Sequence, residues 1–158
     1  MAYIANYVKG SIGYYWQQAQ DTAADIGILL LRSAGLEPED ALKDYQTIAA
    51  MLAGSNDEPA FAGYTRKTFP SPVQTVDPAT NQLILTTASP PPVVLTWSPA
   101  PAGDVFGKVI LYYDPSPGTS TDTQKVHLWG GSINIVTDGS QPTVTLPPSG
   151  IAIARDGA

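Results

Sequence analysis

The chain contains no cysteine, which excludes disulfide frameworks, thiolate metal sites and cysteine nucleophiles. Charged residues make up only 14% of its 158 residues, against about 25% in an ordinary globular protein. A surface with few charges is easily desolvated when a partner covers it, because few ions then need a counter-charge. The low charge therefore favours a subunit of an assembly over a protein that works alone.

Basic residues are the scarcer kind, with 8 Lys and Arg against 14 Asp and Glu and a net charge of −6. Residues 1–69 carry five bases and eight acids (5 − 8 = −3), and residues 70–158 carry three bases and six acids (3 − 6 = −3). A nucleic-acid surface needs a cluster of bases to contact phosphates. Neither part of the chain offers one, so we expect no nucleic-acid partner.

Long apolar runs are also missing. The longest, "IGILLL" at 26–31, is far shorter than the roughly 20 residues that a membrane-spanning helix needs. The opening "MAYIANYVKG" lacks the basic region and apolar core of a signal peptide. We therefore expect no membrane partner and synthesis in the cytoplasm.

His127 is the only histidine of the chain. Metal binding and general-base catalysis usually need a histidine with partners, and here no second imidazole exists. Within "KVHLW" it falls on the strand face opposite Val126 and Leu128, which predicts a half-exposed side chain. No G-x-S-x-G motif is present, so a small hydrolase is the least favoured hypothesis. The sequence predicts no catalytic residue and no cofactor.

Four aspartates in the C-terminal half are candidates for acid pairs in glycoside hydrolysis or for calcium ligands. Each lies next to Gly, Pro, Ser or Thr, the usual neighbours of turn aspartates that bind their own backbone. They show no D-x-D-x-D spacing, so we predict turn residues and no metal site. These residues are Asp104, Asp114, Asp122 and Asp138.

Proline divides the chain, because 13 of its 15 prolines lie at or beyond Pro70. Proline interrupts helices and is tolerated at turns and sheet edges, so any helix should precede this point. We predict one domain over 1–158. Its parts are a possible N-terminal arm or first strand (1–20), a mixed strand and helix segment (21–69) and a proline-rich β segment (70–158).

The N-terminal half contains two patterns of different clarity. "VKGSIGYYW" (8–16) alternates with period two, which predicts a strand or an extended arm. A helix is the rival interpretation, which the two internal glycines weaken. "DIGILLLRS" (25–33) is typical of a buried strand, and Asp44 is a candidate cap for a helix over 45–54.

Short β-branched and aromatic runs between turn signals predict the remaining strands. With those above they make about seven to nine strands with one or two helices, which indicates a mainly β (α+β) fold, a β-sandwich or a partly open barrel. They lie at 64–69, on both sides of the turn "DPATN" (77–81), and at 93–97, 106–114, 124–130, 132–138, 142–146 and 150–154.

Aromatic residues crowd the N-terminus, where the first sixteen residues hold five of the fourteen. Such side chains anchor protein interfaces well, and core packing is the alternative. We therefore treat this group as candidate interface residues: Tyr3, Tyr7, Tyr14, Tyr15 and Trp16.

Arg66 and Lys67, in "GYTRKTF" (63–69), are the only adjacent bases. Strand alternation directs them to opposite faces, so they do not form one phosphate site. We predict that Arg66 pairs with Asp57 or Glu58, within the subunit or across an interface, and we count it as a sixth interface candidate.

The segment "GLEPEDALKDYQTIAAMLAGSNDEPAFAGYTRKTF" (35–69) resembles a family of small virion structural proteins of tailed bacteriophages. The resemblance extends in order over nearly the whole chain. It rests on Gly35-Leu36-Glu37, Asp44-Tyr45, Asn56-Asp57-Glu58, Tyr64, Arg66-Lys67, Val76-Asp77, Asn81, Trp97, Lys108 to Asp114, and Asp138-Gly139.

This resemblance implies a virion protein without catalysis. The first expectation is a head decoration (cement) protein on the capsid exterior, a homo-oligomer whose partner is the major capsid protein. The alternatives are a minor tail or baseplate protein that binds tail proteins, and a receptor- or carbohydrate-binding module. In that last case exposed aromatics such as Tyr113 and Trp129 would stack on sugars.

Overall fold

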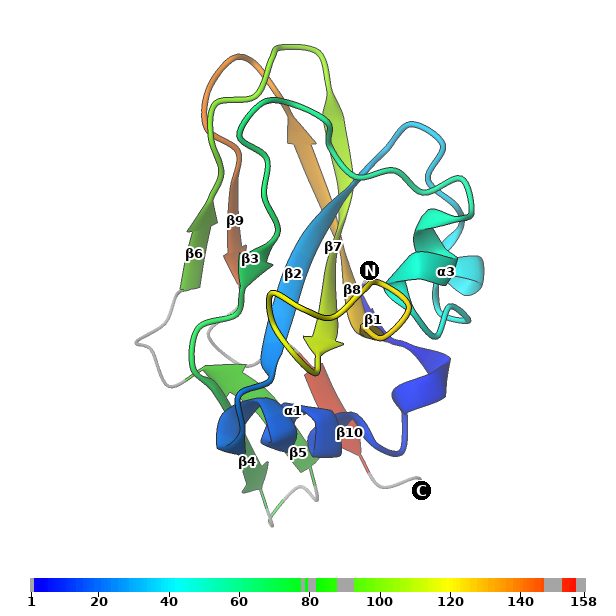
Figure 1. The fold of residues 1–158 in the computed structure, drawn as a ribbon, viewed down its shortest axis with the longest axis vertical. Helices are drawn as coiled ribbons and strands as arrows, with labels where there is room; N and C mark the ends of the chain where they lie inside the picture. Colours follow the sequence, from blue (N-terminus) through cyan, green and yellow to red (C-terminus); the bar gives the residue numbers. More distant parts are fainter. Residues whose placement is uncertain (1, 78, 80–81, 88–92, 147–151, 156–158) are drawn as a thin grey trace.

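The computed structural model describes residues 2–77, 79, 82–87, 93–146 and 152–155. In this part, ten strands form three antiparallel sheets, and every helix precedes residue 53 (Figure 1). The prediction of a mainly β protein with helices in its N-terminal half is therefore confirmed.

The main sheet has five strands in the order β1-β8-β7-β2-β3. Two of the predicted runs, 124–130 and 132–138, form one long strand here, because Gly130 and Gly131 continue the ladder with β7 and β1. The ring of Tyr3 lies so close to Gly130 that a Cβ there would overlap it. The strands are β1 (Ala2–Ile4), β8 (Val126–Val136), β7 (Val105–Asp114), β2 (Asp25–Arg32) and β3 (Lys67–Thr68).

Two smaller sheets complete the β structure. The predicted hairpin around residues 77–81 is confirmed as an antiparallel pair of β4 and β5, which β10 extends on the β5 side. The second small sheet is a two-stranded ribbon of β6 and β9. Their bounds are β4 (Pro72–Asp77), β5 (Gln82–Thr87), β10 (Ala152–Arg155), β6 (Val93–Thr96) and β9 (Thr143–Leu146).

The N-terminal segment contradicts the strand prediction for residues 8–16. After a 3₁₀ turn, η1 (Asn6–Val8), the chain forms the helix α1 (Ile12–Asp21). Its buried residues Ile12, Trp16 and Ala19 are spaced by four and three, which is the spacing of one helix face. Gly13, which weakened the helix interpretation, allows a close approach, since a Cβ there would lie 2.5 Å from Leu83 Cδ2.

The helix predicted over residues 45–54 is shorter than expected and begins at a different cap. α3 (Ile48–Leu52) starts at Thr47, whose side chain accepts a hydrogen bond from the Ala50 backbone N–H. Asp44 instead accepts a hydrogen bond from the Asn6 side chain. A further short helix, α2 (Glu39–Leu42), lies between β2 and α3.

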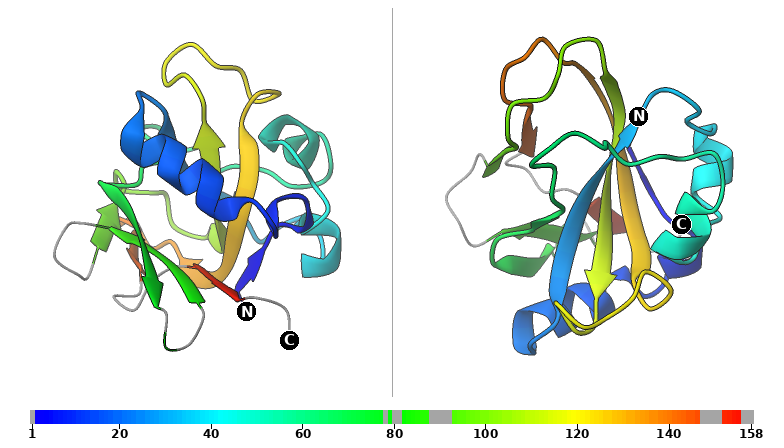
Figure 2. Two further views of the ribbon diagram at one scale, coloured as in Figure 1. Left: turned by 90° about the horizontal axis from the view of Figure 1, so that it is seen from below. Right: turned by 45° about the horizontal axis from the view of Figure 1, so that its top comes forward.

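Apolar side chains cover both faces of the main sheet, so every residue from Ile26 to Leu31 is buried. Ile26, Ile28 and Leu30 join the core beneath α1 and the small sheets, while Leu29 and Leu31 join the core beneath α2 and α3. Two-sided burial explains why this strand has a continuous apolar sequence. Figure 2 shows α1 across the lower end of the main sheet, beside the β4–β5 hairpin.

Candidate functional site

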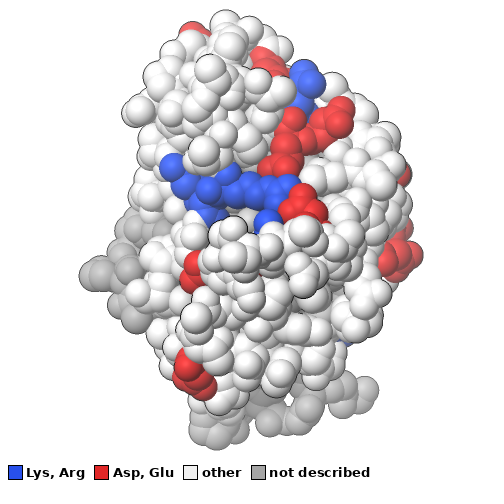
Figure 3. Space-filling model, viewed as in Figure 1, with Lys and Arg blue, Asp and Glu red and all other residues white. Residues whose placement is uncertain are grey.

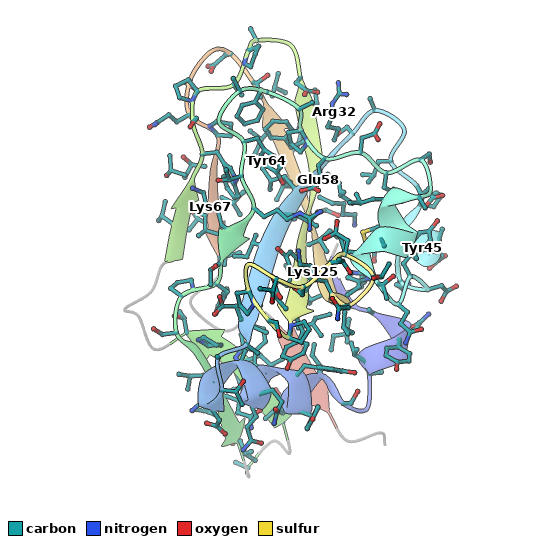
Figure 4. The ribbon with its side chains drawn as sticks, viewed as in Figure 1. Arg32, Tyr45, Glu58, Tyr64, Lys67 and Lys125 are labelled. Carbon is teal, nitrogen blue, oxygen red and sulfur yellow. The ribbon has the colours of Figure 1, made fainter. Side chains whose placement is uncertain are left out.

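Arg66 is the centre of an ion network on the α3 side of the main sheet. Its guanidinium donates from Nε to Glu58 Oε1 (3.0 Å) and from Nη2 to Asp122 Oδ2 (2.8 Å). Tyr64 donates its hydroxyl to Glu58, and Lys125 pairs with Asp122 at 3.1 Å. Figure 4 shows Glu58 in the middle of the view, with Lys125 below it.

This network explains why Arg66 is not a phosphate site. Two carboxylates from distant segments occupy its donors in bidentate fashion, the strongest arrangement for a guanidinium. Hydrogen bonds from Arg66 hold the pKa of Asp122 below its usual value. The predicted partner Glu58 is correct, and the bond lies within the subunit.

Lys67 points away from this network, as the alternation predicted. Its Nζ lies 5.9 Å from the centre of the Trp97 ring. Figure 3 shows Lys and Arg as a short band across the middle of this face, with Asp and Glu directly beside it. Because the neighbouring acids cancel much of the positive potential, the band is a poor surface for phosphate.

His127 is fully buried, so the prediction of a half-exposed histidine is wrong. Neighbouring residues of β8 face opposite sides of the sheet, and both sides are covered. Nδ1 lies 3.2 Å from the Tyr45 carbonyl oxygen, and Nε2 has no partner among the described residues. Burial lowers the pKa of His127 to about 4, which keeps the ring neutral at pH 7.

The loop aspartates divide into two groups. Asp114 and Asp138 accept backbone N–H bonds from Ser116 and Ser140, as turn aspartates do. Asp122 belongs to the Arg66 network, and Asp104 pairs with Arg32 at 3.0 Å. Within the described ranges, no group of three or more His, Asp or Glu side chains is arranged to hold a metal ion.

The six predicted interface residues occupy three kinds of position in the structure. Tyr3 and Trp16 belong to the core, and the Trp16 Nε1–H donates to the Val73 carbonyl oxygen at 3.1 Å. Arg66 is committed to its ion network. Tyr7 and Tyr14 are exposed by 53% and 60%, and Tyr15 is half-buried.

Tyr7, Tyr14 and Tyr15 gather with Tyr113 of β7 into one group, here called the tyrosine surface. Ring centroids lie 5.5 Å apart for Tyr14 and Tyr15, and 5.1 Å apart for Tyr15 and Tyr113. Burial, followed by the neighbouring tyrosines, raises the pKa of Tyr15. The rings therefore support one another in fixed positions while two of them stay open to solvent.

The helix explains how these rings reach the surface. Residues two apart on a helix point about 200° apart, so Tyr14 faces solvent because Ile12 and Trp16 face the core. The sequence indicates Tyr113 only as a candidate for sugar stacking, and no local pattern links it to α1. Trp129, its companion in that hypothesis, is only 7% exposed and offers no free ring face.

The surface around these rings carries little charge. The exposed polar residues of α1 are the neutral Gln17 and Gln20 and a single acid, Asp21. In Figure 3 the area over α1 is correspondingly white, except for red atoms at its left end. Rigid tyrosines on a nearly uncharged helix have the composition of a protein-binding surface, because Tyr buries much area at low entropic cost.

Comparison with protein-family models, with curated proteins and with solved structures finds no match for this chain. In the described ranges, no helix is long and apolar enough to cross a membrane. The functional argument therefore rests on the residues themselves.

Proposed function

We propose that this protein is a non-enzymatic structural component of a tailed-bacteriophage virion. Within the virion we assign it to head decoration, bound to the outer surface of the major capsid protein lattice as a homo-oligomer. The resemblance of residues 35–69 and of the later motifs to phage virion proteins supplies the class of particle. The tyrosine surface supplies the means of attachment and is the observation that carries the proposal.

A decoration protein has to recognise one repeated surface without wrapping around it. Tyr7 and Tyr14 supply exposed rings, and the Tyr14 ring packs on Tyr15, which packs on Tyr113 in turn. Binding then requires little ordering of the subunit, since the rings are already in place. The few charges on α1 leave little to desolvate when the lattice covers it.

Mass spectrometry of heads and tails, separated after disruption of purified virions, tests the location. We expect many copies in the head fraction. Abundance in the tail fraction alone would replace head decoration by a minor tail or baseplate role, and absence from both fractions would overturn the virion assignment.

Attachment is tested by adding purified Tyr14→Ala protein to particles that lack the wild-type protein. A central interface tyrosine typically contributes more than about 1 kcal/mol, so we expect at least about a fivefold loss of affinity. Gln46→Ala is the matched control, because Gln46 is exposed and lies outside α1. Equal binding of both variants would contradict the tyrosine surface as the attachment site.

A further inference from the structure

A pocket of about 480 Å³ opens at the C-terminal end of α1. The last turn of α1, the first residue of β2 and the connection from β3 to β4 surround it, and Figure 1 shows these segments side by side at the lower left. The pocket is separate from the tyrosine surface but shares α1 with it. Its lining consists of Ala19, Gln20, Asp25, Thr68, Phe69, Pro70, Ser71, Pro72 and Val73.

The pocket presents side-chain oxygen atoms that have no bonding partner among the described residues. Four of its lining residues, Gln20, Asp25, Thr68 and Ser71, carry side-chain oxygens. Among the residues that the structure describes, none of these side chains has a hydrogen-bond or ion-pair partner. The acids of the Arg66 network are saturated with donors by contrast, so the open acceptors of the pocket are available to a ligand.

The charge of the pocket has one sign. α1 ends at Asp21 with no base in its last turn, so nothing neutralises the negative end of the helix dipole. Asp25 adds a carboxylate within the lining, and no described Lys or Arg lies within 4 Å of it. This potential disfavours an anionic ligand and attracts a cationic one.

The walls suit a long aliphatic side chain. Ala19, Pro70, Pro72 and Val73 are apolar and stand beside the oxygen-bearing residues. A lysine places its methylene stem against apolar atoms while its ammonium donates three hydrogen bonds. The separate oxygens of the lining also match an ammonium, because its three protons point in different directions and can reach one acceptor each.

We propose that this pocket receives a lysine side chain of the protein to which the chain binds. Asp25 is the counter-ion, and the oxygens of Gln20, Thr68 and Ser71 accept the remaining ammonium protons. For the identity of the partner this inference rests on the proposed function. It adds a charged contact next to the tyrosine surface, which would fix the orientation of the subunit on the lattice.

The pocket is tested on the full chain with n-butylammonium, which copies the lysine side chain, by NMR titration of the backbone amides. We expect saturable shifts at Gln20, Thr68 and Ser71, and none with n-butanol, which lacks the charge. Asp25→Asn should weaken binding at least about tenfold. Asp57→Asn removes the same charge from an exposed loop and should leave binding within about twofold.

A gain-of-function variant guards against a simple folding defect. Gln20→Lys tethers an ammonium at the pocket, so we expect a raised Tm and no remaining response to n-butylammonium. Gln17→Lys places the same side chain one turn earlier on α1, outside the lining, and should leave the response intact.

The outcomes separate this inference from the proposed function. Equal shifts with n-butanol, or unchanged binding by Asp25→Asn, would overturn the lysine pocket wherever the protein is located. Binding of n-butylammonium by a chain that is absent from virions would instead uphold the pocket and overturn the phage assignment. If both hold, Asp25→Asn should lower occupancy on particles at least about tenfold, and unchanged occupancy would show that no lattice lysine enters the pocket.

Discussion

The two sides of the main sheet use their polar groups in different ways. On the side of α2 and α3, Arg66 binds Glu58 and Asp122, and Lys108 binds Glu39 at 2.8 Å. On the side of α1, Tyr7 and Tyr14 are exposed, and the oxygens around Asp25 have no partner among the described residues.

This difference indicates which polar groups maintain the fold and which are free to bind. A group that is satisfied internally gains little from a partner, because any new contact must replace an existing one. A group that is open to solvent gives up only its water on binding, so it retains the ordinary net gain of the new contact. The four predictions below test this contrast by stability, from the largest expected effect to the smallest.

The largest difference in stability is expected between substitutions of Trp16 and Tyr14, two aromatic residues of α1 that are two positions apart. Trp16→Ala removes a ring that is 1% exposed and packs on Phe69 at 5.1 Å between centroids. It should lower the free energy of unfolding by about 3–5 kcal/mol, whereas Tyr14→Ala should change it by less than about 0.5 kcal/mol. Urea denaturation measures both, and similar losses would show that Tyr14 is a core residue as well.

Acid should lower the free energy of unfolding, because His127 is buried in its neutral form. The folded-state pKa is about 4 and the ordinary value is 6.5, so between these values the unfolded state binds a proton that the folded state does not. Stability is therefore unaffected by this group above pH 6.5 and falls as the pH drops toward 4, by at most about 3 kcal/mol.

Chemical denaturation at a series of pH values measures this slope. His127→Gln should be nearly flat between pH 6.5 and about 5, whatever its stability at pH 7. The carboxylates with lowered pKa, such as Asp122, lose their stabilising effect only below about pH 5, so this window reports His127. An unchanged slope in His127→Gln would assign the acid sensitivity to other groups.

Arg66→Ala should lower the free energy of unfolding by about 2–3 kcal/mol. It leaves the partly buried Glu58 without its counter-ion, and Asp122 keeps only its ion pair with Lys125. Lys67→Ala is the matched control, since Lys67 has no ion pair among the described residues, and should change the free energy of unfolding by about 0.5 kcal/mol or less. Thermal and urea unfolding compare the two. A mild effect of Arg66→Ala would mean that the network does not maintain the fold.

The smallest effect is expected at the cap of α3. Thr47→Ala removes the acceptor for the Ala50 N–H and should cost about 1 kcal/mol. Asp44→Ala removes an exposed side chain that is not the cap, and a few tenths of a kcal/mol is the expected change. A reversed order of the two, measured by urea denaturation, would restore Asp44 as the capping residue.

Much of the β structure was predictable from local pattern. β2 and β7 have long apolar, β-branched and aromatic runs, and the turn after Asp77 separates β4 from β5. The helix α1 was not predictable in this way. Over residues 8–16 the apolar residues fit both the period of two of a strand and the helical spacing of Ile12 and Trp16. A window extended to Ala19 would have favoured the helix, since Ala19 continues that spacing.

The candidate sites were harder to predict from sequence patterns than the helices and strands. Arg66 and Glu58 are eight residues apart, so their pairing was within reach of sequence reasoning, whereas Asp122 lies 56 residues from Arg66. His127 looked half-exposed because strand alternation does not reveal that both faces of a sheet are covered. Tyr113 reaches Tyr15 only through the docking of α1.

The amino-acid sequence was sufficient for the class of fold, the low charge and the absence of thiol chemistry, because these depend on composition and on neighbours along the chain. Tertiary structure was needed to decide which aromatics are exposed. Successive side chains turn by about 100° in a helix and 180° in a strand, so the same spacing along the sequence places them on different faces. Tertiary structure also assembled the pocket of Gln20, Asp25 and Thr68 from three segments. Whether an oxygen finds a partner depends on what folds against it, which no local pattern contains.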